Sequence, residues 1–220
     1  MVAADGGALR SKRLALRLDL IVGDADSIDA ASLEQYRDDG VEVRLLPAAK
    51  DASDTELALG AAFERGATTV TLLGALGGLR LDHALANVGL LARDGFAGRQ
   101  IELLDASCRV SLVRGDGVSF GPVRHNLVGP IGGLVSLLPV GVGTTGVTTV
   151  GLLYPLRDEP LPAGTTRGLS NVRVDESASI SVRTGLLLVV ESATNDATAR
   201  IEATNTTAIA AIPPPNPSLR

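Results

Sequence analysis

The sequence predicts an α/β domain followed by an all-β domain, and three features of the chain support this prediction. Residues 1–115 alternate short apolar runs with stretches of helical periodicity, which favours a mostly parallel sheet flanked by helices. From residue 116 to residue 192, Gly, Thr, Val and Ser dominate and no long helical period occurs, which favours a β-sandwich or roll. Residues 193–220 include the proline-rich stretch Ile212–Pro217, so we expect a disordered tail.

Short apolar runs and two helical stretches make up the first domain, a succession typical of Rossmann-like sheets. The segment Ser53–Glu56 has the capping-box pattern, and we expect the helix that it opens to run to about Arg65, where Gly66 ends it. A second helix is predicted over Leu81–Arg93, because apolar residues recur at helical spacing on one face. The predicted strands of this domain are Leu18–Val22, Val41–Leu46, Thr68–Leu73 and Ile101–Leu104.

The second domain is predicted from runs of Val, Leu and Ile that are separated by turn signals. The change in composition places the boundary between the domains near Arg114–Gly117. Aromatic residues make up only 2% of the chain, so both cores must be built from Leu, Val, Ile and Ala. The predicted strands are Leu134–Val140, Thr148–Leu153, Ala178–Val182 and Leu186–Val190.

Charge and composition argue against several classes of protein. Lys and Arg number 20 against 25 Asp and Glu, and no basic run occurs, which argues against a nucleic-acid-binding protein. The four cations of Arg10–Arg17 are interleaved with Leu and Ala, and we interpret them as the solvated side of a helix. Asn126–Leu156 has no charged residue, but its seven Gly and three Pro argue against a membrane span. One cysteine, Cys108, and an N-terminus without a secretory pattern favour the cytoplasm.

Acidic residues follow two of the predicted strands, at the edge of an α/β sheet where ligands bind. Asp24 and Asp26 come directly after the apolar run that ends at Gly23, and Ser27 follows them. Two crowded carboxylates repel each other unless a cation lies between them, and hard oxygen ligands of this kind suit Mg²⁺. A turn followed by a helix N-cap is the structural alternative, because Asp and Ser favour both positions.

A second acidic group, Lys50–Glu56, follows the predicted strand Val41–Leu46. Asp51 and Asp54 lie three residues apart at the start of a helix, where the helix dipole favours anions, so a structural role is again an alternative. The recurrence of acidic strand ends favours one shared site. An acidic protein that binds a polyphosphate needs a metal ion or local cations to offset the repulsion.

Two glycine-rich segments precede predicted helices. Gly74–His83 joins a strand to a helix, and the backbone N–H groups of such a loop can bind phosphate. Arg80 and His83 add donor groups near the helix start, although the pattern is neither a P-loop nor a clean GxGxxG motif. Asp5–Ala8 also precedes a helix, where its Asp-Gly-Gly sequence is by itself a common turn.

The order of these motifs resembles the thiamine pyrophosphokinase family, with nearly the family's spacing. The β-rich part adds Gly146–Leu156 and Thr166–Asn171, which are similar to the family's C-terminal domain. The resemblance covers roughly residues 2–190, and the set of motifs is far more specific than any one of them. The N-terminal motifs that carry it are Asp5–Ala8, Gly23–Ser27, Lys50–Glu56 and Gly77–His83.

The resemblance implies transfer of a diphosphate group from ATP to the hydroxyl of thiamine, giving thiamine diphosphate and AMP, with Mg²⁺ as cofactor. It also implies a homodimer in which thiamine lies between the α/β domain of one subunit and the β domain of the other. By the same resemblance, Asp24, Asp26 and Asp54 are the metal-binding and catalytic acids, and Ser170 and Asn171 belong to the thiamine side. The residues expected on the ATP side are Asp5, Gly6, Gly7, Ser27, Lys50, Asp51, Gly77, Gly78, Arg80, Asp82 and His83.

The chain departs from the family pattern at three places. Leu79 stands after the glycines where the family commonly has Gly-Gly-Arg-x-Asp-His, and Ser53 stands where Thr is usual. Family members usually begin with a strand and a helix before the Asp-Gly-Gly strand. We therefore expect the first βα unit to be missing here, which would leave an edge or gap in the sheet beside the nucleotide site.

Two other functions stay open at this point. The chain could bind nucleotide or thiamine without turnover, or it could be another Mg²⁺-dependent phosphotransferase or hydrolase, since a fold does not fix a function. A purely structural protein gives no reason for so many Asp residues at strand ends. Which Asp accepts the hydroxyl proton is also left open by the sequence.

Overall fold

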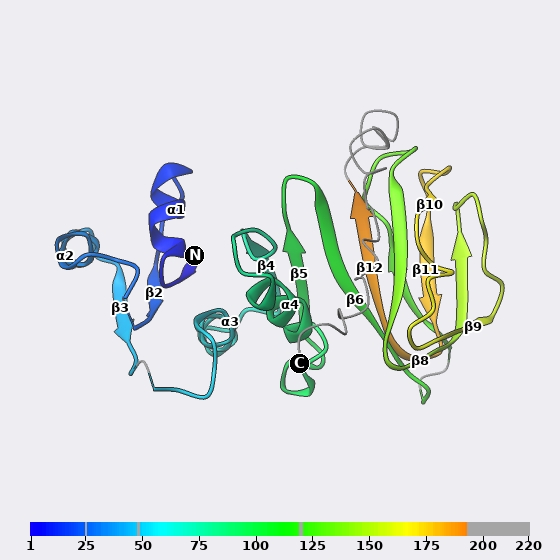
Figure 1. Cartoon of the computed structure of the whole chain (residues 1–220), viewed down its shortest axis with the longest axis horizontal. Helices are drawn as coiled ribbons and strands as arrows, with labels where there is room; N and C mark the ends of the chain where they lie inside the picture. Colours follow the sequence, from blue (N-terminus) through cyan, green and yellow to red (C-terminus); the bar gives the residue numbers. More distant parts are fainter. Residues whose placement is uncertain (25, 48, 119–120, 193–220) are drawn as a thin grey trace, which may run out of the picture.

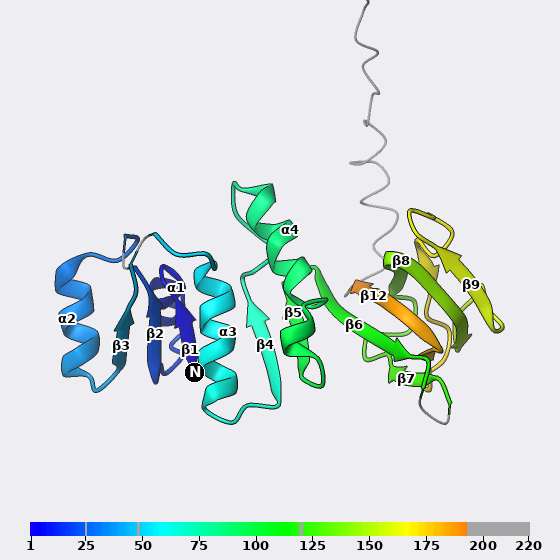
Figure 2. The same cartoon turned by 90° about the horizontal axis from the view of Figure 1, so that it is seen from below.

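The structure, a computed structural model, describes residues 1–24, 26–47, 49–118 and 121–192. The tail after residue 192, for which we predicted disorder, lies outside the described residues. Within them the chain forms a small parallel sheet with helices and a larger curled sheet, which follow one another along the long axis of the molecule (Figure 1, Figure 2). The predicted order of an α/β part and a β-rich part is therefore confirmed.

The first sheet contains three parallel strands, and the second and third of them agree with the predicted runs Leu18–Val22 and Val41–Leu46 to within two residues. In sheet order they are β1 (Val2–Ala4), β2 (Leu20–Gly23) and β3 (Glu42–Leu45). The helices of this part are α1 (Gly7–Arg13), α2 (Ala30–Asp38) and α3 (Asp54–Glu64).

Strand β2 is buried along its whole length because both faces of the sheet are covered. Side chains alternate across a strand, so Ile21 packs into a cluster with Ala8 and Leu33 on one face. Leu20 and Val22 pack on the other face in a cluster that includes Ala58 and Ala61 of α3. The continuous apolar run in the sequence follows from this double covering.

The second sheet begins with two parallel strands and continues with antiparallel ones. Its path runs in the order β4-β5-β6-β12-β8-β11-β7, and β9 and β10 pair with β8 beside this path. The connection between β4 and β5 holds α4 (Leu81–Leu90) and a short 3₁₀ helix, η1 (Asp94–Phe96). The strands are β4 (Thr69–Leu73), β5 (Gln100–Leu104), β6 (Cys108–Asp116), β7 (Val123–Asn126), β8 (Leu134–Val150), β9 (Glu159–Pro162), β10 (Asn171–Val172), β11 (Ser179–Val182) and β12 (Thr184–Ser192).

Helix α4 ends at Leu90, three residues before the predicted end. The chain then turns so that Phe96 of η1 reaches Phe63 of α3, with ring centroids 5.1 Å apart. This aromatic contact packs the connection against the core, and the helical periodicity of the sequence did not indicate it. No described helix is both long enough and apolar enough to cross a membrane.

Strand β8 corrects the prediction of two separate strands at Leu134–Val140 and Thr148–Leu153. The chain between them does not turn back but continues as one strand of 17 residues. Gly141, Gly143 and Gly146 have φ values of 68°, 102° and 63°, so the glycines that we took for a turn instead bend the strand. The bend lets β8 pair first with β12 and then with β11, and this change of partner curls the sheet.

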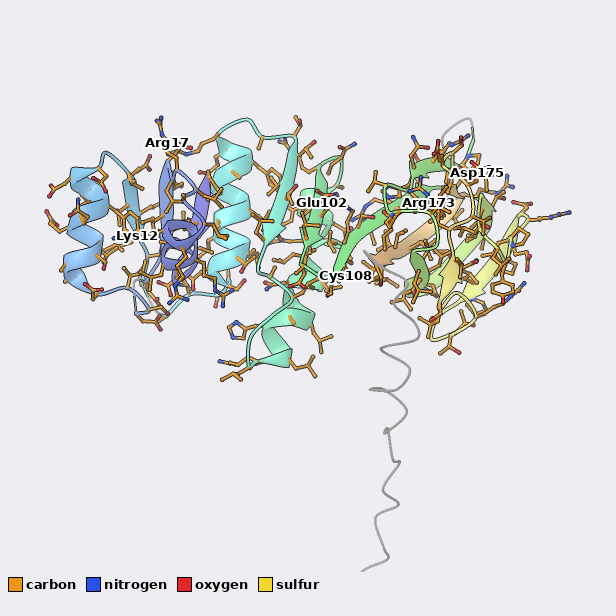
Figure 3. All side chains as sticks on the ribbon, turned by 90° about the horizontal axis from the view of Figure 1, so that it is seen from above. Lys12, Arg17, Glu102, Cys108, Arg173 and Asp175 are labelled. Carbon is orange, nitrogen blue, oxygen red and sulfur yellow. The ribbon has the colours of Figure 1, made fainter. Side chains whose placement is uncertain are left out.

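The curled sheet encloses one core, which includes Leu137 and Val147 of β8, Ile180 of β11 and Leu187 of β12. Buried Arg173 donates to the backbone carbonyls of Gly129, Asp175 and Glu176 in the same part of the molecule, where Figure 3 labels Arg173 and Asp175. The β-rich part is thus a single curled, mixed sheet that continues from β4 and β5.

The predicted domain boundary near Arg114–Gly117 falls at the end of β6. That strand pairs with β5 through Glu102–Leu104 and along its whole length with β12. Glu102 and Cys108 lie in the narrow part of the molecule between the two predicted domains (Figure 3), and Arg109 forms an ion pair with Glu102 there. The sheet is therefore continuous across the junction, and the division at residue 115 stays a prediction.

Two strand edges face a groove between the sheets. Among the described strands, β1 pairs only with β2, and β4 pairs with β5 alone. The groove has a volume of about 1080 Å³ and is lined by residues of β1, β4, α1 and α3. The absence of a first βα unit stays a prediction, but these are two edges to which one further strand could pair.

The curled core makes a stability prediction. Leu187 is 0% exposed, so Leu187→Ala should lower the free energy of unfolding by about 2–5 kcal/mol, because it removes buried methyl groups and leaves a cavity. Leu79→Ala is the matched control, because Leu79 is fully exposed and its replacement should change the free energy by less than about 0.5 kcal/mol. Urea unfolding of both variants measures the difference, and equal effects would contradict this core.

Candidate active site

Three carboxylates meet at the carboxyl edge of the first sheet. Asp5 follows β1, and Asp24 and Asp26 follow β2, its parallel neighbour. One carboxylate oxygen of each lies within 4.8 Å of the others, close enough to share one metal ion. The structure thus brings together two of the three acids predicted to hold the metal, and the third member of the group is Asp5 rather than Asp54.

Asp5 is held in an unusual position. Its backbone has φ 38°, in the left-handed region, and its N–H donates to the carbonyl of Val22 at 2.8 Å. A Cβ on Gly23 would lie 2.9 Å from the Cβ of Asp5, so only glycine lets the two strand ends approach this closely. Glycine before Asp24 in the sequence is therefore a steric requirement of the carboxylate group.

The carboxylate of Asp5 is also in an electrostatically unfavourable environment. It is 8% exposed, and its buried Oδ1 has no hydrogen-bond partner among the described residues. A buried carboxylate oxygen without a partner is costly, and a bound cation would remove this cost. Hard carboxylate oxygens are the ligands that Mg²⁺ prefers, so the donor set fits that metal.

The alternative that Asp24, Asp26 or Ser27 caps the next helix is not what the structure shows. The N-cap of α2 is Asp29, whose Oδ1 accepts from the N–H of Ser32 at 2.8 Å. Ser27 instead donates its hydroxyl to Asp26 Oδ1 at 2.8 Å, and the N–H of Asp26 lies 3.4 Å from Asp24 Oδ1. These residues therefore shape the strand end itself and leave carboxylate oxygens free of the helix.

Lys50 connects the second acidic group to the first. Its Nζ lies 2.7 Å from Asp54 Oδ1 and 3.6 Å from Asp24 Oδ2, with all three side chains largely shielded from solvent. The carboxylate of Asp54, followed by that of Asp24, raises the pKa of Lys50 and keeps it charged. The Lys50 ammonium therefore lies between Asp54 and Asp24, so Asp54 is near the carboxylate group but is not part of it. Asp51 is exposed.

The position of Asp54 is set by the start of α3. Ser53 is the N-cap, and its Oγ accepts from the N–H of Glu56 at 3.2 Å. Half of the predicted capping box is therefore confirmed. The Glu56 carboxylate forms an ion pair with Arg93 after α4, which links the two helices instead of returning to the cap.

The glycine-rich loop leaves β4 and is stabilised by its own contacts. Gly74 and Gly78 have φ values of 70° and 108°, which only glycine adopts readily. Arg80 donates to both oxygens of Asp82, at 3.1 Å and 2.5 Å, and lowers the pKa of Asp82 to about 2. Asn87, which the sequence did not single out, donates to the carbonyl of Ala75 at 2.9 Å and ties the loop to α4.

The predicted thiamine-side residues lie far from these acids within one chain. Ser170 precedes β10, and Figure 1 and Figure 2 show β10 in the part of the molecule opposite to β1. Asn171 is buried, with its Oδ1 accepting from the N–H of Tyr154 and its Nδ2 donating to the Tyr154 carbonyl at 2.7 Å. Asn171 therefore fixes the Tyr154 loop, and the exposed Ser170 stands beside it.

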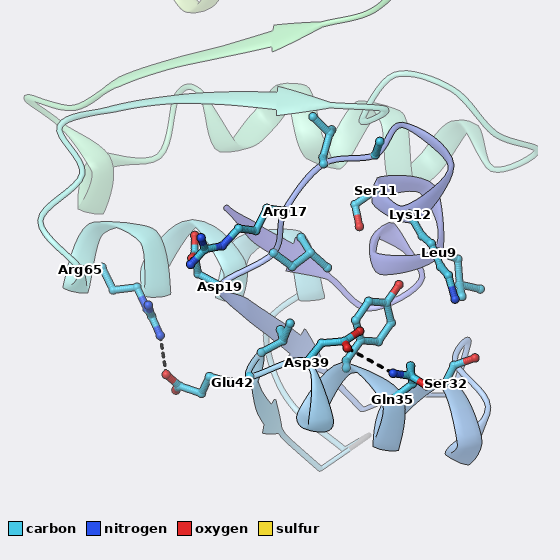
Figure 4. Close-up of a pocket in the computed structure, with 16 residues that line it drawn as sticks. Leu9, Ser11, Lys12, Arg17, Asp19, Ser32, Gln35, Asp39, Glu42 and Arg65 are labelled. Carbon is cyan, nitrogen blue, oxygen red and sulfur yellow. Dashed lines mark hydrogen bonds and ion pairs between the residues drawn. The ribbon is translucent and has the colours of Figure 1, made fainter.

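A second cavity lies at the opposite edge of the first sheet. Its volume is about 810 Å³, and Figure 4 shows Leu9, Lys12, Asp19 and Arg65 around it. Asp19 precedes β2 and Glu42 begins β3, so this cavity is at the amino ends of the strands. Ligands of α/β sheets bind at the carboxyl ends, so the carboxylate group is the better candidate for an active site.

Comparison with known proteins decides the family. Residues 1–103 match the family model described as "Thiamin pyrophosphokinase, catalytic domain", and residues 124–187 match "Thiamin pyrophosphokinase, vitamin B1 binding domain". The chain belongs to the thiamine pyrophosphokinase family.

Individual thiamine pyrophosphokinases agree with this assignment over most of their length. Thiamine pyrophosphokinase 1 of Oryza sativa subsp. japonica is 28% identical over 212 residues, which are 86% of this chain and 77% of the relative. The enzyme of Bacillus subtilis (strain 168) is 26% identical over 171 residues, 77% of this chain and 76% of the relative. The crystal structure of the thiamin pyrophosphokinase from Geobacillus thermodenitrificans superposes with a TM-score of 0.74 at 28% identity, covering 89% of this chain and 86% of the other.

The site makes a prediction about the helix that presents Asp54. Ser53→Ala should lower the free energy of unfolding by about 1 kcal/mol, because it leaves the N–H of Glu56 without its acceptor. Ser53→Thr, which restores the residue usual in thiamine pyrophosphokinases, should retain the stability. Thermal unfolding of the two variants separates the cases, and an unchanged Ser53→Ala protein would contradict the cap.

Proposed function

We propose that this chain transfers a diphosphate group from ATP to the hydroxyl of thiamine and releases AMP. The observation that carries the proposal is the meeting of Asp5, Asp24 and Asp26 at one sheet edge, in a chain with both domains of the thiamine pyrophosphokinase family. A site for a metal-bound triphosphate needs clustered carboxylates for the metal and a loop that can contact phosphate. Both are present here, on the ends of β1 and β2 and on the segment after β4.

We propose Mg²⁺ as the cofactor, held by Asp24 and Asp26 together with Asp5. Bound there, Mg²⁺ would neutralise charge on the phosphate oxygens of ATP. Without bound metal, the Lys50 ammonium offsets the negative charge of Asp24 and Asp54, which limits the repulsion among the carboxylates. The family resemblance also predicts Asp54 as a metal ligand, and Asp54 could join the metal site if the Lys50 ammonium moved to a phosphate.

The chemical step is an in-line displacement at the β-phosphorus of ATP. The thiamine hydroxyl oxygen forms the new bond to phosphorus, the bond to the oxygen that bridges the α- and β-phosphorus breaks, and AMP leaves with that oxygen. The hydroxyl proton passes to a carboxylate of the site. Catalysis of this kind depends mainly on positioning and on charge stabilisation, for which the ends of rigid strands and helices are suited.

The remaining predicted residues have roles on the nucleotide side in this proposal. Ser27 lies against Gly6, since a Cβ there would be 3.2 Å from the Ser27 Cβ, so the two form one surface beside Asp26. The glycines of the loop and its donors lie on the phosphate path. The loop supplies Gly77, Gly78, Arg80 and His83, with Asp82 orienting Arg80, whereas Gly7 begins α1 and exposed Asp51 lies at the rim.

We further propose that the active site is completed between two subunits. Strand β10, which follows Ser170, lies in the opposite part of the chain from β1 and β2, which precede the carboxylates, so a second copy is needed to bring thiamine to ATP (Figure 1). Exposed apolar side chains near Ser170 support a covered surface there: Leu153 is 50% exposed, Tyr154 66% and Val174 50%. A cytoplasmic location for this dimer stays a prediction.

The rival functions differ in their products. A thiamine pyrophosphokinase releases AMP only when thiamine is present, whereas another phosphotransferase releases ADP and a binding protein releases neither. Among the described strands, β1 and β4 each have one edge without a partner. A strand that joined the two sheets there would stabilise the nucleotide side, so AMP formation should also be measured for an upstream-extended chain. Thiamine-dependent AMP in neither chain would contradict the proposed function.

The predicted effect of Asp54→Asn tests the assignment of the catalytic acids. The variant loses one negative charge next to Lys50 and should lower turnover by about 10²–10⁴-fold with the fold intact, as expected for a positioned acid or base. Asp38→Asn is the matched control, because Asp38 is an exposed residue at the end of α2 and its variant should keep full activity. Rates of AMP formation measure both, and normal turnover of Asp54→Asn would show that the role is wrong.

A further inference from the structure

Arg10 crosses the groove between the two sheets. It lies on α1, where the charge pattern predicted a solvated helix face, yet its Nη1 donates to the carbonyl of Gly74 at 3.2 Å. A Cβ on Gly74 would be only 2.9 Å from the same nitrogen, so the guanidinium packs closely against the first residue of the glycine-rich loop. Arg10 is exposed, so the predicted solvated helix face is confirmed, but the sequence pattern did not indicate its contact with Gly74, which is 64 residues away.

The position of Arg10 links the two halves of the proposed site. Gly7 and Arg10 are three residues apart on α1 and so share a helix face. Gly6 contacts Ser27, which is hydrogen-bonded to Asp26 of the carboxylate group. A continuous surface therefore leads from the carboxylates over the start of α1 to Gly74, and its members Gly6, Gly7, Arg10, Ser27 and Gly74 all line one groove.

The Arg10 guanidinium also has N–H donors that could bind an anion. The Lys50 ammonium is occupied by Asp24 and Asp54, and the Arg80 guanidinium by Asp82. Among the described residues, Arg10 forms one hydrogen bond, to Gly74, and no ion pair with a carboxylate. A guanidinium has five N–H donors in a planar fork that suits phosphate oxygens, so most of its donors are available for an anion in the groove.

We propose that Arg10 binds the polyphosphate of ATP while it holds the glycine-rich loop in place through Gly74. The proposal rests on the proposed function and adds to it a phosphate-binding residue that links the two sheets. A polyphosphate that extended along this groove from the carboxylates toward the loop would pass the guanidinium, whose charge would offset the repulsion of an acidic site.

The test compares Arg10→Gln with Lys12→Gln, which removes the same charge from the same helix at a residue that lines the other cavity. Calorimetry with an unreactive ATP analogue and Mg²⁺ measures affinity independently of turnover. We expect Arg10→Gln to weaken binding by about ten- to a hundred-fold, the range for a hydrogen bond to a charged group. Lys12→Gln should change it by less than about threefold, since the charge there is exposed and screened.

Steady-state kinetics separate phosphate binding from a general structural defect. Arg10→Gln should raise the KM for ATP and leave the KM for thiamine unchanged, and Arg10→Lys should restore part of the affinity because it retains the charge but not the fork. Equal affinities of Arg10→Gln and Lys12→Gln would overturn the role of Arg10. Failure of the proposed function would differ, because the unaltered chain would then form no AMP from ATP and thiamine.

Discussion

The repulsion among carboxylates at one edge of a parallel sheet is the constraint on which the rest of the site depends. Parallel pairing of β1 with β2 brings their carboxyl ends together, and with them Asp5, Asp24 and Asp26. The approach is possible only because Gly23 has no side chain to meet Asp5. Three acids lie in such proximity, and one of them, Asp5, has a buried oxygen with no hydrogen-bond partner in the part of the chain that the structure describes, so a divalent cation would stabilise the arrangement.

The same repulsion gives a reason for a cation beside the group, and the site that we propose spans two sheets. Lys50 is held between Asp24 and Asp54, and Arg10 extends across the groove to the loop after β4. The loop and the carboxylates belong to different sheets, so their relative position depends on α3 and on side chains such as Arg10. In the proposed dimer, thiamine would be bound beside Ser170 and β10 of the second subunit.

The sequence predicted the features that depend on local pattern. The buried run before Gly23, the cap at Ser53 and the closeness of Asp24 and Asp26 all follow from periodicity, capping chemistry and strand-end geometry. It could not predict features that depend on long-range contacts. Asp5, which the family resemblance alone placed in the site, completes the carboxylate group through strand pairing. Asp54 is separated from Asp24 by Lys50, and the glycines after Val140 bend β8 instead of ending it.

The most direct test of the account is to locate the metal. Crystals grown with Mn²⁺ and an unreactive ATP analogue would show the ion by its anomalous scattering. The account predicts one Mn²⁺ bound to carboxylate oxygens of at least two of Asp5, Asp24 and Asp26 and also to phosphate oxygens of the analogue. Mn²⁺ held by the nucleotide alone, or by residues away from this sheet edge, would contradict it.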